Sequence, residues 1–255
     1  MNIRMIWGLL AGVGLAFADS DSSRSFPVQL GGCTEYVGTG PIAIAQAARF
    51  VPAPLAVLND GSGNATLVVR ASRCSTVTVD GAGRGEPGVV SHIGISIVSP
   101  DGTGAINNYT IAYATDSARL AQRLERAGLP VLLDTDLVYE VTPAAPVTSS
   151  ELYVEVSPDR GAGWSITGSV TNNAFLTIPF VANWWYKSRE GLVKMATDIP
   201  SITFKAAQAT VITRSTTALG RLLLGANSFS QFGARPADFN VRGEFGAALV
   251  SVSVR

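Results

Sequence analysis

Alternation of apolar and polar residues recurs through most of the chain. In residues 151–157, Leu152, Val154 and Val156 share one face and Tyr153 and Glu155 share the other, which is the two-residue period of a strand with one buried side. β-branched runs bounded by turn residues extend the pattern. The predicted strands are 65–71, 75–80, 89–98, 108–115, 136–142, 151–157, 164–170, 191–197, 201–206, 209–214 and 248–254.

Two segments have helical spacing instead. The first is 116–127, with a cap at Thr115 or Asp116 and a left-handed end at Gly128, since short polar side chains begin helices and glycine ends them. Its apolar stripe consists of Leu120, Ala121, Leu124 and Ala127. The second helix is shorter, 216–224.

Many strands with only two helices predict a mainly β fold with an antiparallel sheet. We expect this sheet to curl into a barrel or cone with the helices packed outside, the alternative being a β-sandwich. The sequence has no low-complexity linker and no repeat of fixed period, so residues 19–255 are predicted to form a single domain.

The first residues predict export. Arg4 precedes a short apolar run that ends in Ala16-Phe17-Ala18, the small-x-small pattern of a cleaved signal peptide. Residues 1–18 are therefore predicted to be removed before Asp19, giving a secreted or periplasmic protein. The alternative is a membrane anchor, but the run is shorter than the ~20 residues a spanning helix needs, and no later stretch is long and apolar enough to span a bilayer.

Cysteine content agrees with an oxidising compartment. Cys33 and Cys74 stand 41 positions apart and are the only two cysteines, which favours one disulfide. Paired metal-ligand spacing is absent from the sequence, so no metal or other cofactor is predicted. The sequons at Asn64 and Asn108 could carry sugar in a eukaryote.

Charge composition narrows the classes of partner that the protein is expected to bind. The formal net charge is +0 and charged residues make up 15% of the chain, so a surface for nucleic acid or for an anionic membrane is not expected. A small-molecule ligand or substrate is the predicted partner, and an oligomer is left open.

The segment 106–131 resembles the acetoacetate decarboxylase superfamily. A strand bearing Tyr109 leads through a helix into "QRLERAGLPV", which is similar to the family segment G-R-E-x-x-G-[FY]-P-K: Arg123 and Glu125 stand near its Arg-Glu, and Gly128 and Leu129-Pro130 match its Gly and aromatic-Pro. Val51-Pro52 could stand for an early Leu-Pro segment. The resemblance implies a cone-shaped antiparallel barrel with an internal pocket.

The resemblance also implies that this chain lacks the imine chemistry of the family. The family has its Schiff-base lysine directly after the proline, where this chain has Val131. Valine has no amine to condense with a ketone, so decarboxylation through an imine cannot be transferred. Lys194 is either a solvated strand residue or a relocated imine lysine, and alternation places it opposite Val193 and Met195.

Polar residues within strands are the other candidates for chemistry. Glu140 interrupts the strand 136–142; facing inward it is a general acid or base, and facing outward an ordinary surface residue. Arg70 is either an inward anchor for a carboxylate ligand or an exposed strand end. His92, the only histidine, is either part of the scaffold or an acid–base group. The sequence contains no G-x-S-x-G elbow, which disfavours a serine hydrolase.

The densest aromatic cluster lies at 180–191. Alternation puts Trp184 and Tyr186 on one side and Trp185 on the other. The cluster is either core packing or a stacking wall for an apolar or planar ligand. The predicted ligand-binding residues are Arg70, His92, Tyr109, Val131, Trp184 and Tyr186, and the predicted catalytic residues are Glu140 and Lys194.

These candidate residues lead to two main hypotheses for the function. The first is an exported barrel that binds a small apolar or carboxylate-bearing molecule without transforming it. The second is an enzyme with non-imine lyase, isomerase or cyclase chemistry on a keto acid or related metabolite, for which Glu140, Arg70 and Lys194 would have to converge on one cavity. A structural or surface-interaction protein without a pocket is a third possibility.

Overall fold

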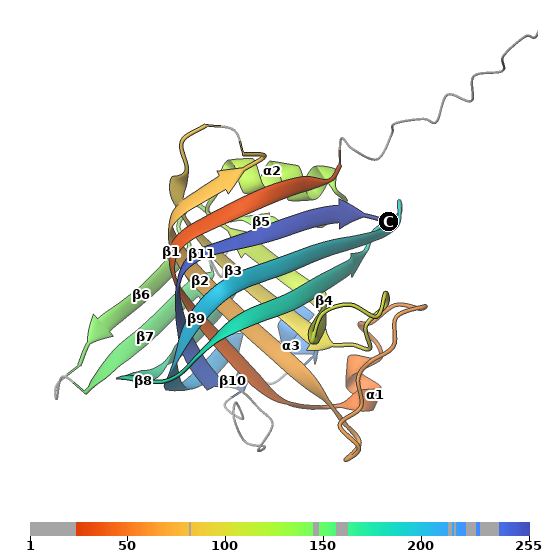
Figure 1. Cartoon of the computed structure of the whole chain (residues 1–255). Coiled ribbons are helices and arrows are strands. Elements are labelled where there is room, and N and C mark those ends of the chain that lie inside the picture. Colours follow the sequence, from red (N-terminus) through yellow and green to blue (C-terminus); the bar gives the residue numbers. More distant parts are fainter. Residues whose placement is uncertain are drawn as a thin grey trace, which may run out of the picture.

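The computed structural model describes residues 24–81, 83–144, 148–156, 163–213, 216, 218–222, 228–229 and 240–255, and the predicted signal peptide lies outside them. Within these ranges the chain forms eleven strands and three helices (Figure 1). The strands are β1 (Phe26–Ala43), β2 (Asn64–Val79), β3 (Glu86–Ser96), β4 (Ile106–Thr115), β5 (Leu132–Leu133), β6 (Val138–Pro143), β7 (Ser149–Val156), β8 (Trp164–Lys187), β9 (Leu192–Thr213), β10 (Ser228–Phe229) and β11 (Asn240–Val254). The helices are α1 (Ile44–Ala47), α2 (Ala118–Arg126) and α3 (Ala218–Leu222).

Seven of the strands close into a barrel. Their order is β9, β11, β1, β2, β3, β4 and β8, and β8 pairs back onto β9 (Figure 1). Neighbours are antiparallel except β4 and β8, which run parallel. The predicted mainly β, antiparallel barrel is thus confirmed over the β-sandwich alternative.

The long strands β8 and β9 belong to two layers. The first part of β8 leaves the ring and pairs with β7, which pairs with β6. This extension packs against the outward side chains of β2 and β3 in one hydrophobic core, which we call the outer core. Leu67 and Ile93 from the barrel are buried there with Val154, Ile166 and Val211. The inner core, within the barrel, includes Phe26, Val28, Met195, Ile199, Ile202 and Val252.

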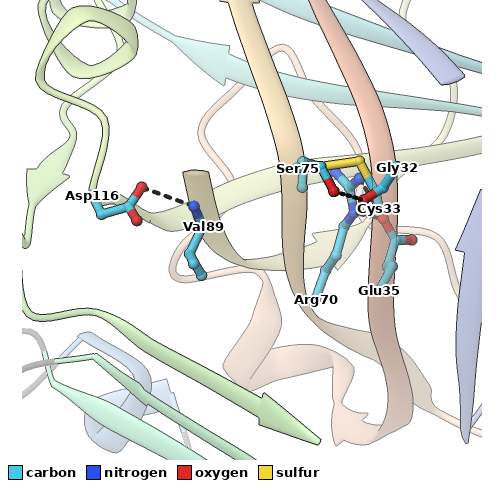
Figure 2. The surroundings of a disulfide bond; sticks show 8 residues. Gly32, Cys33, Glu35, Arg70, Ser75, Val89 and Asp116 are labelled. Atoms are coloured by element: carbon cyan, nitrogen blue, oxygen red, sulfur yellow. Dashed lines mark hydrogen bonds and ion pairs between the residues drawn. A yellow bond between two sulfur atoms is a disulfide. The ribbon is translucent and has the colours of Figure 1, made fainter. Parts of the chain in front are cut away.

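A phase shift in β1 and β2 decides which residues face inward. Phe26, Val28 and Leu30 belong to the inner core, but the next inner-core residue of β1 is Cys33, three positions after Leu30. Gly32 has a φ of 57°, a left-handed conformation that suits glycine. Cys33 and Cys74 are register partners and form the predicted disulfide, beside a hydrogen bond from Ser75 Oγ to the Gly32 carbonyl oxygen (Figure 2).

Helix α2 closes one end of the barrel rather than packing on its outside. Leu120 and Leu124 are buried in the inner core. The capping residue is Ser117, whose Oγ accepts a hydrogen bond from the Leu120 backbone N–H at 3.3 Å, whereas the predicted caps were the two residues before it. The Asp116 carboxylate instead accepts from the Val89 N–H at 2.8 Å and ties the helix entry to β3 (Figure 2).

The predicted strands were often parts of longer ones. Predicted strands 65–71 and 75–80 are one strand, β2, and the three predicted between 191 and 214 are one strand, β9. Strand β1 and helix α1 had not been predicted, and α3 lies within the predicted helix 216–224, of which residues 217, 223 and 224 lie outside the described residues. The residues between the predicted segments lie within these continuous strands, and the pairing is irregular between Cys74 and Val77 in β2 and between Ile199 and Ile202 in β9. Among the described residues, none of the helices could cross a membrane.

Candidate functional site

The barrel interior holds a cavity of about 180 Å³, which we call the main chamber. Most of its lining is aliphatic or aromatic, with a few neutral hydroxyl and amide groups and one ion pair. The lining consists of Glu35, Val37, Thr39, Thr66, Val68, Arg70, Ser96, Ile106, Asn108, Phe180, Ala182, Trp184, Thr197, Ile199, Phe204 and Val241. An apolar chamber with a few convergent polar groups is the usual form of a small-molecule site.

The ion pair joins Glu35 of β1 to Arg70 of β2. Arg70 Nε donates to Glu35 Oε2 at 2.7 Å, and Nη2 lies 2.5 Å from the same oxygen. The side chain of Glu35 is only 1% exposed and that of Arg70 only 10% exposed. Burial of two charges costs about as much free energy as their attraction returns, so such a pair contributes little net stability. The lining of the main chamber thus contains two opposite charges that neutralise each other.

The wall of the main chamber next to Arg70 is Trp184. Its ring lies over β3 where Gly94 has no side chain; a Cβ there would be 2.6 Å from Trp184 Cζ3. Elsewhere in the lining, Ser96 Oγ donates to Asn108 Oδ1 at 3.0 Å. Asn108 is 1% exposed, so a glycan at this sequon is incompatible with the folded barrel, whereas Asn64 is only partly buried.

A second void of about 30 Å³, the small chamber, lies toward α2 and includes Leu120 and Leu124 in its lining. Arg70, Trp184 and Thr197 line both chambers, so the two meet at these residues.

His92 faces the small chamber. Its ring stacks on Trp184 with centroids 3.6 Å apart and meets the edge of Tyr113 at 4.7 Å. Nε2 lies 3.0 Å from Thr110 Oγ1. Complete burial and then the positive charge of Arg70 hold the pKa of His92 well below its ordinary value of 6.5, so the ring is neutral at pH 7.

The structure brings together three of the predicted ligand-binding residues, Arg70, His92 and Trp184. Tyr109 lies in the outer core, where it stacks on Tyr186 at 5.9 Å. Burial, and the neighbouring Tyr186, raise the pKa of Tyr109 to about 12. Neither tyrosine lines a chamber. Tyr109 faces away because its neighbour Asn108 turns inward, whereas Tyr186 follows Trp184 by two positions along β8 and packs against both cores.

Val131 packs against the inner core but lines neither chamber. Its equivalence with the family's lysine position remains a prediction from the motif.

The two predicted catalytic residues are not in the cavity. Glu140 is exposed on β6, because its neighbour Tyr139 is the residue that turns into the outer core. Lys194 is buried, but it lies on the outward face of β9, opposite Met195, as alternation predicts. Its Nζ donates to Asp101 Oδ2 at 2.8 Å and to Thr103 Oγ1 at 2.6 Å. The interpretation of Glu140 and Lys194 as groups that converge with Arg70 is corrected.

The other two lysines also lie outside the chambers. Lys187 Nζ donates to the Ala53 carbonyl oxygen at 2.6 Å, and Lys205 Nζ donates to Glu244 Oε1 at 2.9 Å. The lining of the two chambers therefore includes none of the three lysines in the sequence.

Sequence reasoning missed Glu35, because strand β1 was not predicted. The signal was present as two runs of alternation, at Phe26, Val28 and Leu30 and again from Cys33 through Glu35 to Val37. The Gly31-Gly32 step between them changes the phase, so neither run alone is long enough to stand out.

No protein-family model matches the sequence, and neither does any curated protein sequence. The structure, however, is similar to solved ones. The enduracididine biosynthesis enzyme MppR with bound HEPES buffer is 14% identical with a TM-score of 0.55, over 90% of this chain and 85% of that chain. Acetoacetate decarboxylase from Legionella pneumophila is 9% identical with a TM-score of 0.54, over 90% and 87%.

An acetoacetate decarboxylase-like enzyme from Sphingomonas wittichii RW1 is 10% identical with a TM-score of 0.54, over 91% of this chain and 92% of that chain. These similarities define the class: the chain has the acetoacetate decarboxylase-like fold, as its sequence motifs predicted. At such low identity the fold alone is shared, and the role of each residue rests on this chain's own geometry.

Proposed function

We propose that this protein binds a small, largely apolar molecule in the main chamber of its barrel, without forming an imine with it. The observation that carries the proposal is the chamber itself, which is lined mostly by apolar side chains and has one buried ion pair, Glu35–Arg70, at its inner end. The ligand's apolar body would fill the main chamber, and its polar end would lie near Arg70 and Trp184.

The ion pair favours an apolar ligand over a carboxylate-bearing one. Arg70 is the only cation in the chamber lining, and the Glu35 carboxylate already neutralises it. A ligand carboxylate would approach Arg70 against the negative charge of Glu35, in a medium that screens charges poorly. A neutral polar group on the ligand is not repelled by the Glu35 carboxylate.

The positions of the lysines support binding without an imine. Lys187, Lys194 and Lys205 each donate to an oxygen outside the chambers. To attack a carbonyl in the main chamber, any of them would have to give up its partner and cross the barrel wall.

Toluene is a suitable probe for the proposal. A saturable change in tryptophan fluorescence together with a rise in the thermal midpoint is expected on its addition, because Trp184 lines the chamber. Ala182→Leu should fill the main chamber and weaken binding. Val181→Leu, at the neighbouring position whose side chain is 42% exposed, is the matched control and should bind like the wild type. Equal binding by both variants, or no saturable signal at all, would refute the proposal.

Imine formation is tested separately. Treatment with pyruvate and borohydride, followed by intact mass measurement, should give no covalent adduct. An adduct mapped to any lysine would overturn the part of the proposal that excludes an imine.

A second candidate is an enzyme with non-imine chemistry on a keto acid or related metabolite. One observation favours it: Glu35 places a carboxylate in the chamber lining, where a general base would have to be. MppR, a structural neighbour, has been solved in complex with pyruvate. Glu35 thus replaces Glu140 as the base for this candidate. Solvent-to-substrate deuterium exchange in pyruvate that is lost in Glu35→Gln would favour it over binding alone.

We further propose that the protein is exported as one domain after removal of residues 1–18. The Cys33–Cys74 disulfide is compatible with an oxidising compartment.

A further inference from the structure

Ser96 and Asn108 form a hydrogen-bonded pair in the lining of the main chamber. They are register partners on β3 and β4, and Asn108 is in turn the register partner of Trp184 on β8. All three side chains line the chamber, and Ser96 Oγ donates to Asn108 Oδ1 at 3.0 Å. The Ser96–Asn108 pair therefore lies beside the indole ring of Trp184, in a lining that is mostly apolar.

The amide nitrogen of Asn108 differs from those of the other buried asparagines. Asn107 and Asn183 both donate from Nδ2 to the Thr103 carbonyl oxygen. Nδ2 of Asn108 has no acceptor among the described residues, and it keeps accessible surface although the residue as a whole is buried. A buried donor without a partner costs free energy, so this nitrogen marks a place for a polar atom of the ligand.

We infer that the Ser96–Asn108 pair is a subsite for one neutral hydroxyl group of the ligand, which accepts from one member of the pair and donates to the other. The inference rests on the proposed function and narrows the ligand to an apolar alcohol. It also places the polar end of the ligand on the Asn108 side of Trp184. Arg70, the other group near that end, already donates to Glu35.

One hydroxyl oxygen can reach both members of the pair. The nitrogen and oxygen of an amide group are about 2.2 Å apart. Since Ser96 Oγ lies 3.0 Å from Asn108 Oδ1, it lies at most about 5 Å from Nδ2. A guest oxygen about 3 Å from each atom bridges a separation of up to about 6 Å, so the two atoms are close enough to share one hydroxyl.

The match to a hydroxyl does not depend on which way the amide is turned. In the structure the Ser96 proton is used within the pair, which leaves Nδ2 of Asn108 as a donor and Ser96 Oγ as an acceptor. With the amide turned over, Nδ2 donates to Ser96, and the serine O–H and the amide oxygen are left instead. In both arrangements the pair offers a donor and an acceptor.

Other polar groups fit this pair less well. A hydroxyl is a donor and an acceptor at once, so it satisfies both atoms. A carbonyl oxygen accepts from the donor and leaves the acceptor unpaired. A carboxylate or an ammonium group would bring a buried charge to a pair that has no charge to compensate it.

The size of the main chamber sets the scale of the probes. A dry cavity of about 150 Å³ binds benzene, and the main chamber has about 180 Å³. Toluene, benzyl alcohol and benzaldehyde share a benzene ring and differ in one substituent. Benzyl alcohol donates and accepts, benzaldehyde only accepts, and toluene does neither.

The first test is titration calorimetry of the three probes with the wild-type protein. Benzyl alcohol is expected to bind about tenfold more tightly than toluene, the gain of one good hydrogen bond. Benzaldehyde should bind more weakly than benzyl alcohol, because it leaves the acceptor of the pair unpaired. If benzaldehyde binds as tightly as benzyl alcohol or more tightly, the subsite prefers a carbonyl and the inference is wrong.

The second test removes the pair. In Ser96→Ala/Asn108→Leu a ligand hydroxyl would be buried without a partner, so the preference should reverse to about tenfold in favour of toluene. The matched control is Ser150→Ala/Asn172→Leu, which removes a similar pair outside both chambers, where Ser150 Oγ donates to Asn172 Oδ1 at 3.0 Å. The control should keep the wild-type ratio. An unchanged ratio in the chamber variant would overturn the inference, and if that variant does not fold, the order of the probes on the wild type decides.

The outcomes separate the two proposals. If toluene binds and benzyl alcohol binds no more tightly, the hydroxyl subsite is wrong and the proposed function stands. If none of the three probes binds, the proposed function is wrong and the subsite falls with it.

Discussion

Removal of the negative charge from the buried Glu35–Arg70 pair tests whether these two residues stabilise each other in the lining of the main chamber. Glu35→Gln keeps the shape of the side chain but leaves the Arg70 guanidinium, 10% exposed, without a counter-charge. Loss of one partner of a buried pair costs about 3–5 kcal/mol. We expect a loss of about 3 kcal/mol in the free energy of unfolding, at the lower end of that range, because the amide oxygen can still accept from Arg70 Nε.

The assay is urea unfolding followed by far-ultraviolet circular dichroism, with the disulfide oxidised. Glu244→Gln is the matched control, since Glu244 pairs with Lys205 at 2.9 Å but is 37% exposed; exposed pairs contribute about 0–1 kcal/mol. The double variant Glu35→Leu/Arg70→Met removes both charges and should recover to within about 1 kcal/mol of the wild type. If the double variant is no more stable than Glu35→Gln, the two residues are not coupled and the reasoning about the pair is refuted.

Three further predictions concern the disulfide, His92 and the N-terminus. Cys33→Ser/Cys74→Ser should lose about 4 kcal/mol in the free energy of unfolding, measured by urea titration, because the crosslink closes a loop of 41 residues; an unchanged midpoint would contradict this. The pKa of His92 is depressed in the folded state, so the unfolded chain alone gains its proton as the pH falls below the ordinary value of 6.5, and stability should decline there. His92→Phe should reduce that decline in urea midpoints measured from pH 8 to pH 5, and identical slopes would refute the burial argument. Mass spectrometry of exported protein should give an N-terminus at Asp19, whereas a retained leader would favour a membrane anchor.

Much of the fold could be predicted because alternation and turn residues are local signals. Alternation along the predicted strand 89–98 puts His92, Gly94 and Ser96 on one face, and in the structure His92 and Ser96 line the chambers. The helix before Gly128 was predicted to within two residues at its start. The closure of the ring could not be predicted in this way, since the parallel pairing of β4 with β8 joins segments more than 70 positions apart.

Predictions for the site depended on which face of each strand turned inward. Arg70 and Glu140 were both polar residues in apolar strands, with both orientations open. Arg70 turned out to face the chambers, and Glu140 is exposed. The difference lies in their neighbours: β2 belongs to the closed ring, whereas β6 belongs to the extension, whose buried face is directed at the outer core. Local pattern does not contain that information.

The phase shift at Gly32 connects the disulfide to the site. If the alternation of Phe26, Val28 and Leu30 continued unbroken along β1, Glu35 would face the outer core. The partner strand changes phase at the same place, where Val77 and Cys74 are both inner-core residues, and without that change Arg70 would face outward as well. The crosslink Cys33–Cys74 sits directly beside the shift and joins the two strands in register. The crosslink therefore holds in place the irregularity that turns Glu35 and Arg70 into the barrel, where Arg70 is the register partner of His92 on β3. The inward position of this ion pair thus depends on the Gly31-Gly32 step.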